Sequence, residues 1–297
     1  MNILVTGANG QLGNEMRLLA PQFPEHRFFF SDLFVPDNAP VRIFPLDITC
    51  RDALRNFVSG NSIQLVINCA AYTNVDRAEQ DEPTARSINA LAVENIALTG
   101  ARVIHISTDY VFSGDGCLPC RESDPVAPRT AYGRTKLEGE RLLLDAAPDS
   151  VIFRTAWLYS SFGNNFVKTM LRLGAQRDTL TVVYDQVGTP TYAADLAAAV
   201  MAAVQSREWH PDIYHFTNEG VCSWYDFARE IFRQHNAMHA DAPISCRVLP
   251  CLSSEYASPT PRPHYSVLDK SLVKRTFNLT IPHWTDALAR CLSIINK

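Results

Sequence analysis

Three evenly spaced glycines near the N-terminus constrain the fold of this chain most strongly. Gly7, Gly10 and Gly13 occur in the run Gly-Ala-Asn-Gly-Gln-Leu-Gly, which follows the apolar residues 3–6 and precedes a helical pattern over residues 11–20. A strand that turns into a helix over so few residues requires a tight turn with positive φ, and close packing of the helix on the strand leaves no room for a Cβ. The motif therefore predicts a specialised βα unit, because an ordinary turn needs only one glycine.

Apolar runs of strand length alternate with helical segments through the first half of the chain. We predict strands at residues 3–6, 27–31, 65–70, 103–107 and 151–157, and helices at residues 11–20, 84–98 and 132–146. This order is typical of a parallel sheet covered by helices. We therefore expect an α/β fold, a Rossmann-type doubly wound parallel sheet, with a smaller C-terminal substrate-binding lobe.

The glycine motif, placed between a strand and a helix, indicates a bound dinucleotide. The backbone amides at the start of the helix, in the run from Gly10 through Gln11 and Leu12 to Gly13, would face the pyrophosphate. Unpaired N–H groups and the helix dipole favour negative charge there. Gly7 would let the backbone approach the phosphates closely, and we expect NADPH or NADH as the cofactor.

Asp32 closes the second predicted strand, 25 residues after Gly7. At about this distance a carboxylate hydrogen-bonds the adenosine ribose, and it would repel the 2′-phosphate of NADPH. Because residues 33–38 contain no Arg or Lys, the sequence favours NADH, although Asp32 is also consistent with an ordinary strand end. Asp47, with the Ile48 amide beside it, is a candidate for the edge of the adenine.

Beyond residue 158 the pattern is less regular. We predict helices at residues 165–174, 192–204 and 223–235, strands at residues 181–184 and 213–217, and a long loop over residues 242–263, which are rich in Pro and Ser. Residues 1–157 are expected to form the NAD(P)-binding Rossmann domain, with residues 185–205 packing back on it. Residues 158–184 and 206–297 are expected to form the substrate-binding lobe.

Composition and charge exclude two classes of partner. Hydrophobic residues make up 46% of the chain and charged residues 20%, and no apolar run approaches the roughly 18 residues that a membrane span needs. The net charge is −4 and no basic stretch contains aromatic residues, so we expect neither a membrane nor a nucleic acid as partner. The N-terminus enters a strand pattern at once, without a signal-peptide pattern, and we expect a cytoplasmic protein.

The eight cysteines are scattered, at positions 50, 69, 117, 120, 222, 246, 251 and 291. In a chain of this length they are expected to be reduced and mostly buried thiols. Cys117 and Cys120 have the spacing of metal ligands, but no second such pair and no nearby His accompanies them. We therefore expect two loop thiols and no metal site.

Tyr132 and Lys136 lie four residues apart at the start of a predicted helix, so both side chains project from one face. Reduction of a ketone requires a proton for the developing alkoxide, and a tyrosine supplies it well when its phenolate is stabilised. A nearby ammonium lowers the tyrosine pKa, and Lys136 would also hold ribose hydroxyls. The spacing alone also occurs on solvated helices, but its place downstream of a glycine loop favours a reductase.

Thr108 ends the predicted strand at residues 103–107, where parallel strands deliver side chains into the crevice at the edge of the sheet. Its hydroxyl is a candidate to donate to the substrate oxygen, and Asp109 is a candidate to accept from a sugar hydroxyl. Ser107 competes for the role of Thr108, and spacing does not choose between them. Capping of the following loop would also explain Thr108 and Asp109.

These motifs resemble the extended short-chain dehydrogenase/reductases, and among them the dTDP-4-dehydrorhamnose reductase family. The resemblance rests on the glycine motif and on Asn-Cys-Ala-Ala-Tyr-Thr-Asn-Val-Asp-Arg-Ala-Glu (68–79), Ser-Thr-Asp-Tyr-Val-Phe (107–112) and Tyr-Gly-Arg-Thr-Lys (132–136). It continues through Arg-Thr-Ala-Trp-Leu-Tyr (154–159), Gly-Asn-Asn-Phe (163–166), Asp-Gln-Val-Gly-Thr-Pro-Thr (185–191) and Arg-Pro-His-Tyr-Ser-Val-Leu-Asp (262–269). It thus covers nearly the whole chain.

The resemblance implies NAD(P)H-dependent reduction of the 4-keto group of a dTDP-linked hexulose to dTDP-L-rhamnose, a step of polysaccharide biosynthesis. Tyr132 would donate the proton, Lys136 would orient Tyr132 and the ribose, and Thr108 would tune the substrate oxygen. The sugar would contact Asp109 and Trp157, for which core packing is the alternative. The nicotinamide side would be lined by Ala70, Ala71, Tyr72 and Thr73.

Arg262 is our candidate for binding the pyrophosphate of the substrate, because a planar guanidinium binds phosphate oxygens in pairs. Some members of the resembled family are thought to form dimers bridged by magnesium and glutamates. Glu15 is present here, but residues 192–204 and the tail after Trp284 contain no glutamate. A homodimer is compatible with the sequence, whereas a metal bridge is not supported, and we expect Glu15 to be a solvated helix residue.

Two other functions remain open on the sequence. A regulatory subunit of methionine adenosyltransferase has this kind of chain and binds the dinucleotide without turnover. A sugar-nucleotide epimerase or dehydratase would recycle a tightly held NAD. Dehydratases of this superfamily have a pair of carboxylates in the loop after the strand, whereas here Asp109 is followed by Tyr110.

Overall fold

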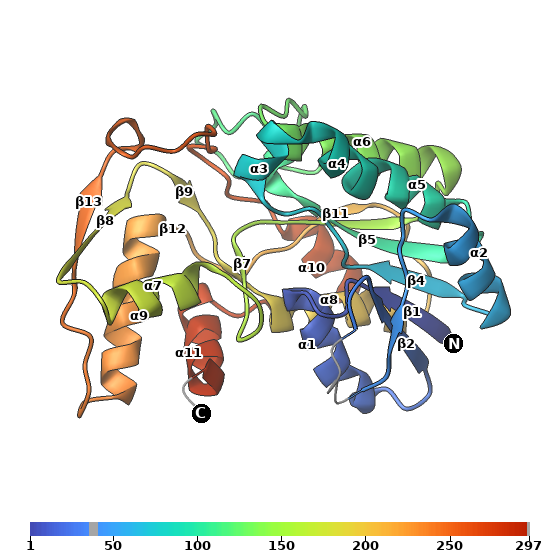
Figure 1. The fold of residues 1–297 in the computed structure, drawn as a ribbon, viewed down its shortest axis with the longest axis horizontal. Helices are drawn as coiled ribbons and strands as arrows, with labels where there is room; N and C mark the ends of the chain where they lie inside the picture. The colour runs from blue at the N-terminus through green and yellow to red at the C-terminus, as the bar shows by residue number, and fades with distance from the viewer. Residues whose placement is uncertain (36–40, 296–297) are drawn as a thin grey trace.

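The computed structural model describes residues 1–35 and 41–295. It has two parts, a large sheet with helices on both faces and a smaller lobe at the left of Figure 1. The predicted Rossmann-type doubly wound α/β fold is confirmed. The two parts are joined by several chain crossings, because the chain passes from the sheet to the lobe after residue 155 and returns to the sheet later.

The large sheet has seven strands in the order β11-β6-β5-β4-β1-β2-β3, and all neighbours are parallel. The order reverses between β1 and β4, and ligands of open α/β sheets bind in the crevice at such a switch point. The strands are β1 (Asn2–Thr6), β2 (Arg27–Asp32), β3 (Ile43–Pro45), β4 (Leu65–Asn68), β5 (Arg102–Thr108), β6 (Val151–Thr155) and β11 (Ile213–His215).

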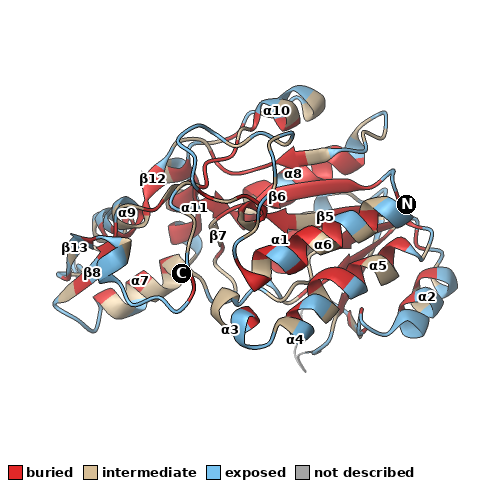
Figure 2. Ribbon diagram, turned by 90° about the horizontal axis from the view of Figure 1, so that it is seen from above, coloured by how far each residue is buried: buried red, intermediate tan, exposed pale blue. Residues whose placement is uncertain are grey.

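Helices cover both faces of this sheet, and the buried residues form one layer of core on each face (Figure 2). One face carries α1 (Gln11–Leu19), α8 (Ala193–Gln205) and α10 (Ser271–Phe277), with a 3-10 turn at Ala20–Gln22. The other carries α2 (Arg51–Gly60), α5 (Ala92–Ala97) and α6 (Ala131–Ala146), against whose start α3 (Val75–Gln80) and α4 (Glu82–Arg86) pack. The alanine-rich α8 packs closely on α1, whereas residues 187–188 and 191–192 of the range 185–205 pair with strands of the smaller lobe.

The single helix predicted at residues 84–98 is interrupted. Between α4 and α5 the chain forms a π-helical segment, Ser87–Leu91. The buried Asn89 at its centre donates to the Tyr72 carbonyl (3.1 Å) and to Thr135 Oγ1 (3.2 Å), and accepts from the Tyr72 N–H (2.8 Å). Asn89 therefore connects the loop after β4 to α6 through hydrogen bonds. Such π-helical segments are frequent at functional sites.

The smaller lobe has its own core, made by residues of three helices and of several short strands. The helices are α7 (Phe166–Gly174), α9 (Trp224–Met238) and α11 (Trp284–Ile295). Three short strand pairs accompany them: β7 (Leu158–Tyr159) with β10 (Thr191–Tyr192), β9 (Val187–Gly188) with β12 (Cys222–Ser223), and β8 (Thr179–Val183) with β13 (Arg247–Cys251).

Strand β13 corrects the prediction of a long loop over residues 242–263. It pairs in parallel with β8 over its whole length, and a 3-10 turn follows at Ser253–Glu255. The sequence concealed it because Arg247–Cys251 is mostly exposed, lacks the alternation of a half-buried strand, and contains Pro250. Proline is tolerated on an edge strand, where its missing N–H breaks no ladder.

The predicted boundaries between the two parts remain a prediction, but two elements of the range 206–297 lie with the large sheet. β11 is its edge strand beside β6, and Val273 of α10 is buried in the core of one face. All eight cysteines are free. Four of them are buried, so the expectation of mostly buried thiols holds for only half of the set.

Candidate active site

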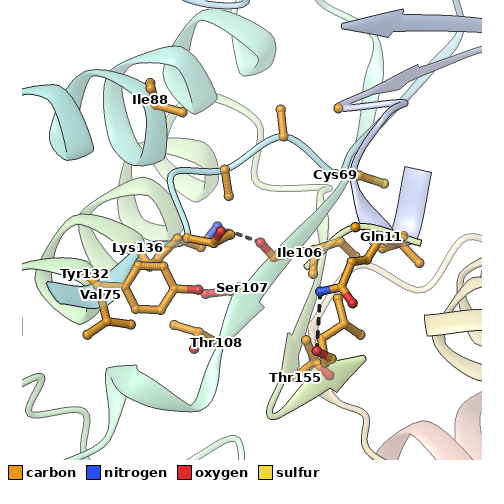
Figure 3. A pocket seen from close by; sticks show the side chains of 18 of the residues that line it. Gln11, Cys69, Val75, Ile88, Ile106, Ser107, Thr108, Tyr132, Lys136 and Thr155 are labelled. Atoms are coloured by element: carbon orange, nitrogen blue, oxygen red, sulfur yellow. Dashed lines mark hydrogen bonds between the residues drawn. The ribbon is translucent and has the colours of Figure 1, made fainter. Parts of the chain in front are cut away.

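A cavity of about 1250 Å³ runs along the carboxyl edge of the large sheet and ends against the smaller lobe. Figure 3 shows Tyr132, Lys136, Thr108 and Ser107 on one side of it and Gln11 on the other. The cavity brings together most of the residues that the sequence singled out. They are Gly7, Gly10, Gln11, Leu12, Asp32, Asp47, Ile48, Ala70, Ala71, Thr73, Thr108, Asp109, Tyr132, Lys136 and Trp157.

The glycine loop has the geometry that its sequence requires. Gly7 has φ of 66°, and a Cβ there would lie 2.6 Å from the Ala70 nitrogen. Gly13 does not line the cavity, and a Cβ on it would lie 2.2 Å from the Gly7 carbonyl oxygen. Its role is therefore the close packing of α1 on the loop. Gly10 precedes α1 as its N-cap, so the first amides of the helix open into the cavity.

Asp32 lies at the end of β2 and lines the cavity. Its carboxylate accepts from the Asn9 N–H (2.9 Å) and the Phe34 N–H (3.4 Å). The charge of Asp32 also raises the pKa of Arg17, although partial burial lowers this pKa more. Arg17 is a cation near this site that the sequence did not single out. Residues 36–38 of the segment 33–38, which contains no Arg or Lys, lie outside the described part of the chain.

Asp47 and Ile48 line the same end of the cavity. The Asp47 carboxylate accepts from the N–H (2.8 Å) and Oγ1 (2.7 Å) of Thr49, and this turn presents the Ile48 backbone. Tyr72 is not among the lining residues, whereas its neighbours Ala71 and Thr73 are. The two hydrogen bonds between its backbone and Asn89 hold this loop in place instead.

Tyr132 lies in the first turn of α6, which begins where Thr130 Oγ1 accepts from the Gly133 N–H (3.0 Å). A Cβ at Gly133 would lie 2.3 Å from the Tyr110 carbonyl, so glycine lets the helix start against the segment after β5. The Tyr132 ring meets Tyr110 edge-on, with ring centroids 5.4 Å apart. Burial raises the pKa of Tyr132, and a hydrogen bond with the Thr108 side chain partly opposes this rise.

Lys136 is buried one turn further along α6. Its ammonium donates to the Ile106 carbonyl (2.6 Å) and lies 3.1 Å from His105 Nε2. Burial lowers the pKa of Lys136 to about 8, while the Glu140 carboxylate opposes the fall. The expected lowering of the Tyr132 pKa by Lys136 is not seen, because burial dominates the Tyr132 pKa and Lys136 is turned to β5.

Thr108 and Asp109 form the junction between β5 and a 3-10 turn, Asp109–Val111. Thr108 Oγ1 donates to Asp109 Oδ1 (2.9 Å) and accepts from the Tyr110 N–H (3.2 Å), so the capping role also holds. Burial raises the pKa of Asp109 to about 7. Within the described residues, Asp109 Oδ2 and Ser107 Oγ are buried without a hydrogen-bond partner. Both residues line the cavity, but these two atoms are covered by the protein itself.

Trp157 lines the cavity at its border with the smaller lobe and has φ of 49°, an uncommon value for a bulky residue. Its ring stacks on Trp224, with centroids 3.6 Å apart and planes 10° apart. Trp224 also lines the cavity, and the sequence did not reveal it, because it comes from α9, 67 residues further along the chain.

Arg262 is not among the lining residues. It donates to Asp76 Oδ1 (2.7 Å) and to the Tyr110 hydroxyl (3.3 Å), and Tyr110 does line the cavity. Its guanidinium therefore lies just behind the wall of the site. Binding of a pyrophosphate by Arg262 stays a prediction, and would require Arg262 to leave or share Asp76.

Glu15 corrects another expectation. It is buried, with 5% of its surface exposed, and its carboxylate accepts from Ser160 Oγ (2.6 Å). The chain entering the smaller lobe covers this face of α1, so the pattern of α1 alone made Glu15 look solvated. Burial raises the pKa of Glu15.

Across residues 1–35 and 41–295, no cluster of three His, Cys, Asp or Glu side chains could hold a metal ion. Over the same residues, no helix has the length and apolar character to cross a bilayer.

Comparison with known proteins finds similarity over nearly the whole chain. The family model described as "RmlD substrate binding domain" matches residues 1–296. A dTDP-4-dehydrorhamnose reductase of Streptomyces griseus is 42% identical over 96% of this chain and 91% of its own length. A protein of Streptomyces antibioticus named probable dTDP-4,6-dihydroxy-2-methyloxan-3-one 4-ketoreductase is 40% identical, over 97% of this chain and 93% of its own.

A solved structure extends this similarity to the fold. The dTDP-4-dehydrorhamnose reductase of Bacillus anthracis, in complex with NADP, superposes with a TM-score of 0.87 at 36% identity and covers 99% of both chains. The chain therefore belongs to the family of the RmlD substrate-binding domain, whose members include the dTDP-4-dehydrorhamnose reductases.

Proposed function

We propose that the protein is an NAD(P)H-dependent oxidoreductase that reduces the 4-keto group of dTDP-4-dehydro-β-L-rhamnose to dTDP-L-rhamnose. The observation that carries the proposal is the convergence of Tyr132, Lys136 and Thr108 in one cavity with the glycine loop of β1 and α1. The curated relatives with this reductase name support the substrate.

The residues of the glycine loop fit a dinucleotide. A Cβ at Gly7 would collide with the backbone of Ala70, and the unpaired amides at the start of α1 favour a pyrophosphate. NAD(P)H, when bound, supplies a hydride. The cavity of about 1250 Å³ exceeds the roughly 300–1,000 Å³ of an ordinary ligand pocket, so a cofactor and a nucleotide sugar can share it.

Tyr132 holds the proton that the reaction consumes. As hydride reaches C4 of the sugar, the ketone oxygen becomes an alkoxide, and transfer of the Tyr132 hydroxyl proton to this oxygen completes the alcohol. Burial keeps Tyr132 protonated until then. Lys136, in its charged form, stabilises the tyrosinate that remains. Thr108 lies beside Tyr132, and its hydroxyl donates to the same oxygen once it turns away from Asp109 Oδ1, its acceptor in the structure. Contact of Asp109 with a sugar hydroxyl stays a prediction.

The preference for NADH is weaker on the structure than on the sequence. Asp32 would repel a 2′-phosphate, but Arg17 lies close enough for its charge to interact with that of Asp32. The Bacillus anthracis relative binds NADP. Use of both cofactors is therefore our proposal. A cytoplasmic location stays a prediction from the sequence, and a homodimer without a metal bridge is compatible with the sequence.

A second candidate is reduction of a 4-keto group on a different dTDP-linked deoxy sugar. The Streptomyces antibioticus protein, which carries such a name, is 40% identical to this chain, compared with 42% for the Streptomyces griseus reductase. Both candidates use the same Tyr132 chemistry and differ only in the sugar that contacts Asp109 and Trp157.

A coupled assay tests the proposal. The purified protein, given dTDP-4-dehydrorhamnose and either NADH or NADPH, should consume the absorbance at 340 nm. Tyr132→Phe should lower kcat by about 10²–10⁴-fold while the affinity for the cofactor, measured by fluorescence titration, stays within a factor of two to three. Cofactor binding without consumption for any dTDP-keto-sugar would instead favour the regulatory-subunit alternative.

A further inference from the structure

A chain of polar side chains runs through the core behind Lys136, from β5 to β4 to β1. His105 Nε2 lies 3.1 Å from Lys136 Nζ, and His105 Nδ1 lies 3.0 Å from Asn68 Nδ2. Thr6 Oγ1 donates to Asn68 Oδ1 (2.6 Å). At most 1% of the surface of each of these four side chains is exposed. Such a network is costly to bury unless each member has a matching partner.

The backbone decides how Asn68 is oriented. The Ala70 N–H, which can only donate, lies 3.2 Å from Asn68 Oδ1. The amide of Asn68 therefore presents oxygen to Ala70 and its NH₂ group to His105. Turning the amide over would face two donors toward each other at Ala70.

The orientation of Asn68 in turn selects the tautomer of His105. The NH₂ of Asn68 donates to His105 Nδ1, so Nδ1 carries no proton and the neutral imidazole has its proton on Nε2. Burial and the nearby Lys136 charge hold the pKa of His105 well below its usual value, so the ring stays neutral. The Nε2–H donor then faces Lys136 Nζ. An ammonium has no lone pair to accept it, whereas a neutral amine has one.

We propose that Asn68 and His105 are positioning residues that set the protonation of Lys136: Asn68 holds His105 as the Nε2–H tautomer, and this tautomer favours the neutral amine of Lys136. The proposal rests on the proposed function, in which charged Lys136 stabilises the Tyr132 phenolate. The network therefore limits the pH range in which Lys136 is charged, in addition to burial, which lowers the pKa of Lys136 to about 8.

Other charges around Lys136 act differently. On α6, Glu140 raises the pKa of Lys136, but Glu140 is itself held in a buried ion pair with Arg154 of β6 (2.6 Å). Asp109, in the turn after β5, shares the cavity, and burial raises its pKa to about 7. Tyr132 is neutral in this range. His105 is thus the titratable group in direct contact with Lys136 Nζ among the residues that the structure describes.

The direct test needs no substrate. In protein labelled with ¹⁵N-histidine, the ring nitrogen shifts of His105 should show the Nε2–H tautomer at neutral pH. In protein labelled with ¹³C-lysine, the Lys136 Cε resonance should titrate below the ordinary lysine range, and the few lysines of the chain (136, 168, 270, 274 and 297) make assignment practicable. An Nδ1–H tautomer of His105 would overturn the proposal.

Asn68→Asp reverses the hydrogen bond, because a carboxylate accepts from His105 Nδ1–H and leaves Nε2 free to accept from the Lys136 ammonium. The Lys136 pKa should rise by about one unit or more. The double variant Asn68→Asp/His105→Phe separates this route from the direct attraction of the new charge. If the rise persists in the double variant, the tautomer does not set the protonation of Lys136, and the proposal fails.

Thr6→Val is the matched control. It removes one donor to Asn68 and leaves the Ala70 N–H to orient the amide, so the Lys136 pKa should not move. If Asn68→Asp does not fold, the tautomer of His105 in the unaltered protein still tests the proposal, because the proposal requires the Nε2–H form. In the reductase assay, the loss of kcat/KM at alkaline pH should move upward with the Lys136 pKa in Asn68→Asp. Absence of turnover with the expected tautomer and titration would count against the proposed function alone.

Discussion

The two ends of the cavity are constructed in different ways. At the cofactor end, short stretches of consecutive residues form much of the surface, and the β1–α1 loop and the loop after β4 approach so closely that Gly7 has no room for a Cβ. At the substrate end, side chains from β5, β6, α6 and α9 form the surface, and Trp157 and Trp224 meet from distant parts of the chain. Backbone sites tolerate few substitutions but recognise a common group, whereas side-chain sites change specificity one residue at a time.

Gly7→Ala should have the largest effect and should confine it to the cofactor end. The new Cβ at φ of 66° would lie 2.6 Å from the Ala70 nitrogen. Strain and overpacking together should lower the free energy of unfolding by about 2–5 kcal/mol and weaken cofactor binding. Denaturant unfolding and cofactor titration would measure both. Gly60→Ala is the control, because a Cβ at Gly60 meets nothing within 4 Å among the described atoms. Equal losses in the two variants would contradict the close approach at Gly7.

Arg262→Ala should affect the substrate end alone. Loss of charge-assisted hydrogen bonds to the pyrophosphate should raise KM for the nucleotide sugar by about 10–100-fold and leave KM for NAD(P)H nearly unchanged. Steady-state kinetics with each substrate varied in turn would show the difference. Asp76→Asn removes the partner that now holds Arg262 and should not raise KM for the sugar. Similar increases for both substrates in Arg262→Ala would rule out the assignment.

Trp224→Ala should have a smaller effect at the same end. The ring of Trp157 would lose its stacked neighbour, and a pair of this kind contributes about 0.5–1.5 kcal/mol, so kcat/KM for the sugar should fall by about 10-fold or less. Trp209→Phe is the control, since Trp209 packs on the core of the large sheet away from the lining residues. If Trp224→Ala changed cofactor affinity instead, the stack would belong to the cofactor end.

Asp109→Asn should produce the smallest change, visible in stability and dependent on pH. The pKa of Asp109 is about 7 in the folded protein, against an ordinary value of 3.8, so the folded state binds a proton that the unfolded state releases between these values. The unaltered protein therefore loses stability as pH rises from about 4 to about 7, and the asparagine variant does not. The Tm of Asp109→Asn relative to the unaltered protein should increase by a few degrees between pH 5 and pH 8. A pH-independent difference would show that Asp109 is not protonated in the fold.

The same contrast explains how far the sequence could predict the molecule. The glycine loop and the Tyr132/Lys136 pair are local patterns, and Gly7, Gly10, Tyr132 and Lys136 line the cavity. Trp224 and His105 escaped notice because their partners are brought to them only by the fold. The prediction that Glu15 is solvated was wrong because its hydrogen-bond partner, Ser160, comes from a distant part of the chain. The π-helical segment at Asn89 has no signature in residues 84–98, since its partners Tyr72 and Thr135 lie on other elements.

The stacked pair of Trp157 and Trp224 has an optical consequence. Two indoles with centroids 3.6 Å apart share their excited states, so the pair should give an exciton-type band in near-ultraviolet circular dichroism and a fluorescence distinct from that of Trp209 and Trp284. Trp157 and Trp224 both line the cavity. A ligand that separates or tilts their rings should therefore change both the circular dichroism band and the fluorescence. Binding at the substrate end of the cavity should thus be measurable from the intrinsic tryptophan signals, without a label.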